Sequence, residues 1–197
     1  MMNMQKLTRD DLYSLEKYAA LRDEFRDEVL LHKRNRRLEL GTNAALYFED
    51  RMTMQYQIQE MLRIERIFEA DGINEELEAY NPLIPDGSNW KATFMVEFPD
   101  VDERRAMLGQ LVDIENRVYV QVGDMDKSYA IADEDLDRAD EQKTSAVHFL
   151  RFELSNEMVA ALKEGASLAA GIDHPNYQVE ISPVAENIRK SLLGDLD

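Results

Sequence analysis

The sequence predicts an α+β protein in which N-terminal helices and a short β-hairpin pack on a mixed or antiparallel sheet. Residues 51–70 place apolar side chains at helical spacing, whereas the second half of the chain alternates strand-like segments such as WKATFMVEF (90–98) with segments that begin in helix-capping residues. At 197 residues the chain can bury a sizeable core, because a chain of this size removes roughly 70% of its unfolded surface from water. We therefore expect one compact domain.

Composition narrows the classes of partner and chemistry. Forty acidic and 23 basic residues give a formal net charge of -17, which repels phosphate backbones and anionic lipid head groups. We expect neither a nucleic acid nor a membrane as partner. No stretch approaches the roughly 20 apolar residues of a membrane-spanning helix, and the first residues have no apolar signal core, so we expect a cytoplasmic protein. Zero cysteines exclude thiol catalysis and a cysteine-ligated cluster, so a divalent metal such as iron would need His, Asp or Glu ligands.

The first predicted helix ends in a dense group of cations. Thr8 and Asp11 resemble an N-cap and an acidic first turn, and the helix is expected to run to about residue 36. The segment LLHKRNRR then supplies four cations, Lys33, Arg34, Arg36 and Arg37. In one interpretation they complement the dipole of the helix C-terminus. In the other they neutralise buried carboxylates or hold an anionic ligand through bidentate guanidinium contacts.

A hairpin and a central helix follow. Residues 37–49 alternate around Gly41, which predicts two short strands, and the helix is expected to run from Arg51 to a closing glycine at Gly72. On a helical wheel Gln57 and Glu65 fall within the apolar arc, so both are expected to be buried and to need partners. The apolar members of that arc are Met54, Ile58, Met61, Leu62, Ile64 and Phe68.

The rest of the chain reads as two strand-helix-strand units. A short helix at 74–80 leads into the loop 81–89, which contains two prolines and a glycine. This loop is the best internal boundary. It would divide the chain into a helical part with the hairpin (1–80) and an α/β part (81–197). Strands are then expected at 90–98, 117–123, 146–154 and 177–181, with helices at 100–116, 155–165 and 183–193. Asp100 and Ser155 are the predicted caps of the first two of these helices.

The candidate site lies between the cations at 33–37 and the central helix 51–70. We predict anion or ligand binding by Arg34, Arg36, Arg37, Gln57 and Arg63, and metal binding, if any, by Glu65, Glu60 and His32. An ion-pair network that joins two helices explains the same residues without a ligand. The central helix has no Glu-x-x-His motif of the kind that holds a di-iron centre.

Other candidates have weaker patterns. Asp124 to Asp135 spaces its acidic residues like a calcium loop, but Tyr129 replaces the glycine that such a loop needs, so a solvated acidic loop over 133–141 is the simpler interpretation. His148 alternates with apolar neighbours and is expected in the core, and His174 is expected to stabilise a turn. No nucleophile elbow, phosphate-binding glycine loop or zincin helix is present.

Several strings of this sequence resemble an uncharacterised bacterial family of a domain of unknown function. They are HKRNRRLELG, YFEDRMTMQYQIQEMLRIERI, EELEAYNPLIP, VHFLRFEL and GIDHPNY, which together span most of the chain. Genes of that family often neighbour those of rubrerythrin and an iron-sulfur oxidoreductase-like protein. The resemblance implies an accessory protein of an oxidative-stress or redox system that acts through contacts with a redox protein or as a homo-oligomer. The alternative is a metal- or anion-dependent enzyme, or a small-acid sensor, at the candidate site.

Overall fold

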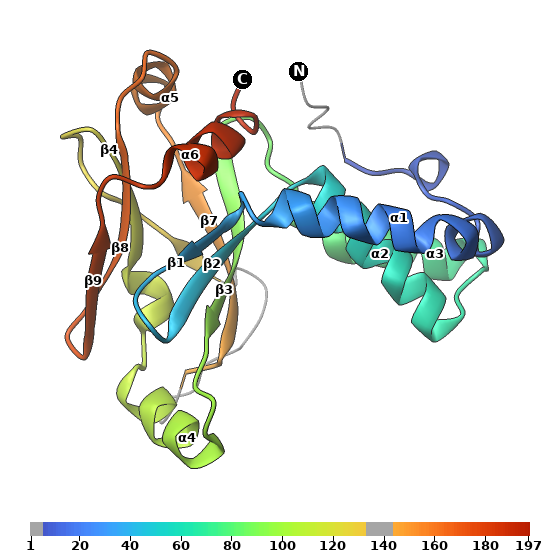
Figure 1. Ribbon diagram of the computed structural model, residues 1–197, viewed down its shortest axis with the longest axis horizontal. Coiled ribbons are helices and arrows are strands. Elements are labelled where there is room, and N and C mark those ends of the chain that lie inside the picture. The colour runs from blue at the N-terminus through green and yellow to red at the C-terminus, as the bar shows by residue number, and fades with distance from the viewer. Residues whose placement is uncertain (1–5, 133–143) are drawn as a thin grey trace.

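A computed structural model describes residues 6–132 and 144–197, and within them the strands form two antiparallel sheets (Figure 1). The order in the larger sheet is β1-β2-β3-β7-β6, and in the smaller one β5-β4-β8-β9. The α+β class with N-terminal helices is confirmed, but the strands divide between two sheets where one was predicted. The strands are Arg37–Glu39 (β1), Ala44–Glu49 (β2), Asn89–Val96 (β3), Val118–Val122 (β4), Ser128–Tyr129 (β5), Ile131–Ala132 (β6), Val147–Glu153 (β7), Leu168–His174 (β8) and Tyr177–Ile181 (β9).

Each predicted strand-helix-strand unit connects the two sheets. The first runs from β3 through α4 (Val101–Gln110) to β4. The second runs from β7 through α5 (Asn156–Lys163), but the strand that follows α5 is β8, which was not predicted, and the predicted strand at 177–181 is β9. Both predicted caps are confirmed: Asp100 accepts hydrogen bonds from the amides of Asp102 and Glu103, and Ser155 accepts one from Met158. Helix α4 ends before the predicted residue 116, and a 3-10 turn (Ile114–Arg117) precedes β4. The two sheets therefore share one hydrophobic core, which includes Phe94, Val120, Phe152 and Ile172.

Strand β8 is the main element that the sequence pattern missed. Its segment LAAGIDH is rich in alanine and glycine, which have low strand propensity. The fold needs a glycine there, because a Cβ on Gly171 would lie 2.4 Å from the carbonyl oxygen of Val179 and 2.6 Å from the hydroxyl of Tyr119. Small side chains let β9 and the Tyr119 ring approach this strand closely. Because small residues are also poor strand formers, the sequence pattern did not indicate a strand here.

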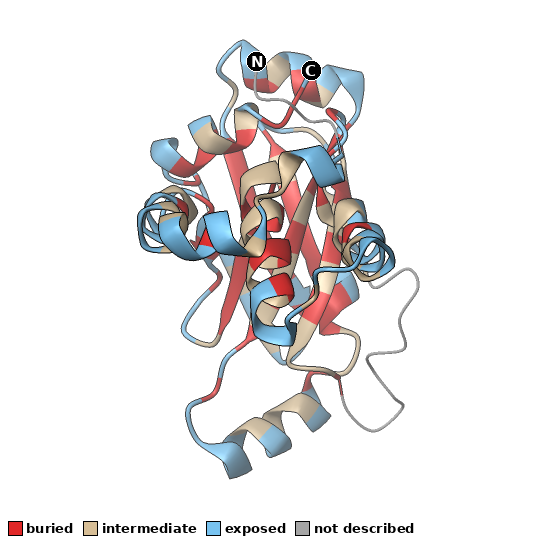
Figure 2. Ribbon diagram, turned by 90° about the vertical axis from the view of Figure 1, so that its right-hand side faces the viewer, coloured by how far each residue is buried: buried red, intermediate tan, exposed pale blue. Residues whose placement is uncertain are grey.

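Helices α1 (Leu15–Lys33), α2 (Arg51–Glu65) and α3 (Ala70–Tyr80) form a helical arm that projects from the sheets (Figure 1). Viewed from the arm side, buried residues concentrate in the strands behind it (Figure 2). The arm has its own hydrophobic cluster, in which α2 and α3 are joined by residues from the segments before and after the helices: Leu7, Met54, Ile58, Leu62, Leu77 and Ile84. The hairpin β1-β2 belongs instead to the sheet core, and the boundary at 81–89 stays a prediction.

The arm helices begin and end at other residues than predicted. Helix α1 starts after Ser14, whose hydroxyl accepts from the amide of Lys17, whereas Thr8 and Asp11 cap only a 3-10 turn (Arg9–Asp11). Helix α2 stops at Glu65, so that Gly72 lies inside α3. None of the described helices combines the length and apolar character needed to cross a membrane.

Helix α2 is closed by Arg66 rather than by a glycine. Arg66 adopts a left-handed backbone conformation with φ of 57°, which is costly for a residue with a Cβ. We expect Arg66→Gly to stabilise the protein by about 0.5 to 1 kcal/mol, which raises Tm by a few degrees. Thermal unfolding followed by circular dichroism measures this shift.

Arg26→Gly is the matched control, because Arg26 is exposed in the middle of α1 with ordinary helical geometry. Glycine in a helix interior should destabilise by about 1 kcal/mol. If both variants lose stability equally, the left-handed residue carries no strain.

Finally, α6 (Glu186–Leu193) closes the sheet core near the C-terminus. It buries Ile188 and Leu192 against the sheets, as expected for the last helix. The indole nitrogen of Trp90 on β3 donates to the carbonyl oxygen of Leu192 at 2.9 Å. The C-terminal segment is thereby fixed to the centre of the larger sheet.

Candidate functional site

The glutamines of α2 bind the main chain of the segment before α1, which we call the N-terminal strap (residues 6–14). Gln59 is fully buried; its carbonyl oxygen accepts from the amide of Tyr13 at 2.6 Å and its amide nitrogen donates to the Tyr13 carbonyl oxygen at 3.3 Å. Gln55 donates to the carbonyl oxygen of Asp11 at 2.7 Å. Because the strap is not part of a sheet, these carboxamides pair groups that a neighbouring strand would otherwise satisfy.

Asn81 completes the same arrangement at the other end of the strap. Its side chain accepts from the amide of Leu7 at 2.8 Å and donates to the Leu7 carbonyl oxygen at 2.9 Å. Two carboxamides therefore imitate a strand pair at two points of the strap. Two of the glutamines on α2, Gln55 and Gln59, are thus explained by an irregular segment that covers the helix.

Glu60 joins α1 to α2. Its carboxylate accepts from the Tyr18 hydroxyl at 2.8 Å and from Arg22 at 2.7 and 2.9 Å, and Arg63 lies 3.3 Å away. Hydrogen bonds from Arg22, followed by those from Arg63 and Tyr18, lower the pKa of Glu60 to about 2 although partial burial opposes them. This predicted site residue is therefore an ionised member of a closed ion-pair network.

The expected burial of Glu65 is wrong. Glu65 is the exposed last residue of α2, and Ile64 and Phe68, also expected inside, are exposed. The strap instead covers the face of α2 that carries Gln59, which is fully buried. Gln57 is half-buried, with its amide 3.5 Å from the Tyr80 hydroxyl.

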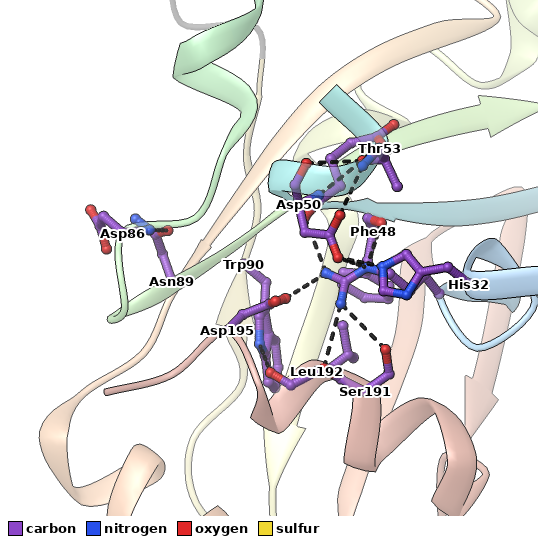
Figure 3. A network of polar contacts seen from close by, with 12 residues as sticks. His32, Phe48, Asp50, Thr53, Asp86, Asn89, Trp90, Ser191, Leu192 and Asp195 are labelled. Carbon is purple, nitrogen blue, oxygen red and sulfur yellow. Dashed lines mark hydrogen bonds and ion pairs between the residues drawn. The ribbon is translucent and has the colours of Figure 1, made fainter. Parts of the chain in front are cut away.

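Arg36 is the centre of a buried polar network that we call the C-terminal latch. Figure 3 labels its partners Phe48, Asp50, Ser191 and Asp195. The Arg36 side chain is 1% exposed and donates to main-chain carbonyl oxygens at Phe48 (3.0 Å) and Glu49 (3.1 Å). It also donates to the carboxylate of Asp195 at 2.5 Å and to the hydroxyl of Ser191 at 3.3 Å. One guanidinium thus ties the β2-α2 junction to the C-terminal segment.

The other side of the latch consists of Asp50 and His32. Asp50 caps α2 by accepting from the amide of Thr53 at 3.0 Å; its second oxygen lies 2.5 Å from His32 Nε2 and 3.3 Å from Arg36 Nε. Burial acts to raise the pKa of Asp50, but the His32 hydrogen bond and the Arg36 charge lower it overall. Burial raises the pKa of Asp195 to about 6 against the opposing effect of Arg36. His32 is therefore engaged with a carboxylate rather than open toward a ligand.

The remaining cations of the cluster lie on the surface. Arg34 and Arg37, together with Lys33, line a groove of about 620 Å³ between the end of α1, the hairpin and α6. Ile188 of α6 also lines this groove, although it is far away in the sequence. The structure thus separates the predicted anion-binding residues into Arg36 in the latch, Arg34 and Arg37 in the groove, and Gln57 and Arg63 on α2.

The predicted metal ligands do not come together. His32 contacts Asp50, Glu60 contacts Arg22, and Glu65 lies at the far end of α2. Within residues 6–132 and 144–197, no three His, Asp or Glu side chains form a group that could hold a metal ion. The calcium-like spacing cannot be followed to its end, because Asp135 and the rest of 133–141 lie outside the described residues.

Both other histidines have structural partners. His148 is fully buried, and its Nε2 lies 2.8 Å from the Thr144 hydroxyl. His174 Nε2 lies 3.0 Å from the Val112 carbonyl oxygen, and its Nδ1 accepts from the amide of Asn176 at 3.2 Å. These contacts fit a core histidine and a turn-stabilising histidine.

Fold and site together define a class: an α+β protein of two antiparallel sheets and a helical arm, whose buried charges join the arm and the C-terminus to the sheets. The chain belongs to the family described as "Protein of unknown function (DUF3501)", whose model matches residues 6–196. A crystal structure of a protein of unknown function from Burkholderia pseudomallei is similar, with a TM-score of 0.93 and 51% sequence identity over 98% of this chain and 100% of that chain. No curated protein matches the chain.

Proposed function

We propose that the protein is a cytoplasmic accessory protein that acts by docking another protein on the end of its helical arm. The main support is a pair of exposed apolar residues, Ile64 and Phe68, which we call the arm tip. Ile64 is 58% exposed and Phe68 is 73% exposed. Scattered apolar residues are normal on protein surfaces, but these two lie only four residues apart in the chain, one in the last turn of α2 and one in the connection to α3.

The position of the tip supports the proposal. Helix α2 begins directly after strand β2 and has 15 residues, so its end lies roughly 22 Å away from the hairpin. A large aromatic side chain at the end of such a projection is typical of interface anchors, which insert into a pocket of the partner.

Contacts along the arm support it further. The latch, the Glu60 ion pairs and the strap hold α1 and α2 in one arrangement. A rigid arm loses little conformational entropy on binding, which favours affinity.

The kind of partner comes from the resemblance noted above. Family genes that neighbour those of rubrerythrin and an iron-sulfur oxidoreductase-like protein point to a redox protein, active during oxidative stress. We propose such a protein as the occupant of the arm tip. In this proposal the redox protein carries out the redox reaction, and the present protein binds it.

Copurification tests this function. Tagged protein from peroxide-treated cells is expected to recover a redox protein of either kind, and Phe68→Ser is expected to reduce the recovered amount at least tenfold, since a buried aromatic anchor commonly contributes more than about 1.4 kcal/mol to binding. Leu31→Ser is the matched control, because Leu31 is 63% exposed but lies on α1, away from the tip.

Recovery of no redox protein under peroxide stress, or equal recovery by Phe68→Ser and wild type, contradicts the proposal. Light scattering of the purified protein covers self-association, the other arrangement that the tip allows. A dimer that Phe68→Ser converts to a monomer would assign the tip to a second copy of this chain.

A further inference from the structure

We propose that the groove beside the end of α1 binds a small amphiphilic carboxylate, a molecule with one carboxylate head group and a short apolar tail. The groove has a volume of about 620 Å³, within the range of small-molecule sites. It is formed by the last turn of α1, strands β1 and β2, and Ile188 of α6. The proposal does not depend on docking at the arm tip, which lies at the other end of α2.

Two cations of the groove are available to an anion. Arg34 is exposed and forms no ion pair with any residue in the described part of the chain. The Lys33 ammonium has no carboxylate partner among the same residues and lies 5.8 Å from the centre of the Tyr56 ring. The chain as a whole carries a net charge of -17. These two cations give the groove a locally positive charge that attracts an anion.

Arg37 extends the cationic wall from the strand side. Its guanidinium lies over the Tyr47 ring at 5.4 Å and is 3.2 Å from Glu39 and 3.7 Å from Glu97. All three charged side chains are substantially exposed, so these ion pairs are weak and an incoming carboxylate can compete for the guanidinium. The Tyr47 ring beside this guanidinium also lines the groove.

The other wall of the groove is apolar. Leu30, which is 44% exposed, supplies most of this apolar surface, whereas Leu38 and Ile188 also line the groove but are only 5% and 8% exposed. An inorganic anion would leave this apolar surface in contact with water, whereas a hydrocarbon tail would cover it. A ligand that carries both parts therefore matches the groove better than either part alone.

The charge balance favours a monoanion. Glu39 also lines the groove. A doubly charged phosphate would therefore be repelled by this carboxylate and by the net negative charge of the whole protein. A carboxylate has half that charge and still fits the fork of an arginine with two parallel hydrogen bonds. The inferred ligand class is accordingly carboxylic acids with a chain or ring of a few carbons.

Calorimetric titration of the full-length protein with octanoate tests the inference, with acetate and octyl phosphate as comparison ligands. We expect saturable octanoate binding with one site, and much weaker binding of acetate and of octyl phosphate. Arg34→Ala and Leu30→Ser should each weaken octanoate binding roughly tenfold, through the head group and the tail respectively. Both residues are exposed, so both variants are expected to fold.

Arg26→Ala is the matched control, because Arg26 is an exposed arginine of the same helix outside the groove, and it should leave octanoate binding unchanged. The inference is overturned by any of three results: octanoate does not saturate, Arg34→Ala binds it as tightly as wild type, or octyl phosphate binds as tightly as octanoate. It is also overturned if the groove proves to hold a protein, that is, if octanoate fails to bind while Arg34→Ala loses the copurified partner.

Discussion

Arg36→Ala is expected to destabilise the protein by about 3 to 5 kcal/mol, the largest effect of any single change considered for this chain. The substitution removes the guanidinium that donates to two main-chain carbonyl oxygens and to Asp195, and it leaves two buried carboxylates without their shared cation. Urea unfolding followed by the fluorescence of Trp90, the only tryptophan, measures the loss next to the latch.

Arg34→Ala is the matched control for this experiment. Arg34 is two residues away but exposed, so its removal should change the free energy of unfolding by less than about 0.5 kcal/mol. Arg36→Lys should also be strongly destabilising, because one ammonium cannot reproduce the planar set of donors. If Arg36→Ala and Arg34→Ala have equal stability, the latch does not hold the C-terminal segment.

The deficit of Arg36→Ala should depend on pH. In the wild type the folded-state pKa of Asp195 is raised to about 6, so this carboxyl reduces stability above pH 6, and the reduction is relieved as pH falls toward its unfolded value of 3.8. Loss of the Arg36 charge removes an influence that lowers the pKa of both Asp195 and Asp50. The two carboxyls of the variant therefore take up protons at higher pH than those of the wild type.

The difference in unfolding free energy between wild type and Arg36→Ala should consequently shrink between pH 7 and pH 4. Parallel urea titrations at several pH values measure it. A difference that stays constant over this range would show that the lost packing of the side chain, and not the two unpaired carboxylates, causes the deficit.

Gln59→Leu is expected to have the second largest effect, a loss of about 1 to 3 kcal/mol. Leucine is similar in size, but it leaves the amide and the carbonyl oxygen of Tyr13 without their partner on α2. The cost has an upper limit, since the strap can detach and return these groups to water. Detachment gives a second measurement: trypsin should cleave after Arg9 faster in the variant than in the wild type.

Gln57→Leu provides the comparison. Gln57 is a glutamine of the same helix with one long contact of 3.5 Å to Tyr80, so its replacement should cost well below 1 kcal/mol and leave cleavage at Arg9 unchanged. Equal losses for the two variants would mean that the hydrogen bonds to the strap contribute nothing beyond ordinary helix packing.

Features that depend on neighbours in the chain could be predicted from the sequence. The hairpin 37–49, the caps Asp100 and Ser155, and the helix at 51 follow from turn chemistry and from hydrogen bonds that span a few residues. The resemblance to a family of unknown function was also confirmed by the match over residues 6–196. By contrast, β8 was missed, because its close contact with Tyr119 and β9 requires the small residues that weaken a strand pattern.

For the candidate site, the sequence indicated that polar residues on α2 needed partners, but it could not name them. Gln59 faces the strap 46 residues earlier, and the strap has no regular pattern that would reveal where it lies. One signal was available: the alternation of Arg36, Leu38 and Leu40 with exposed residues places the arginine on the buried side of the first strand.

The sequence by itself determined the α+β class, the acidic surface and the concentration of cations at 33–37, because composition and local periodicity depend only on the order of residues. The alternation along the first strand indicates the buried side of Arg36, but only the tertiary structure shows which groups pair with it. The backbone leaves α1 and enters β1 within this run, so Arg36 turns inward to meet Asp195, 159 residues away, while Arg34 and Arg37 turn outward into the groove. The division between latch and groove is set by partners far away in the sequence.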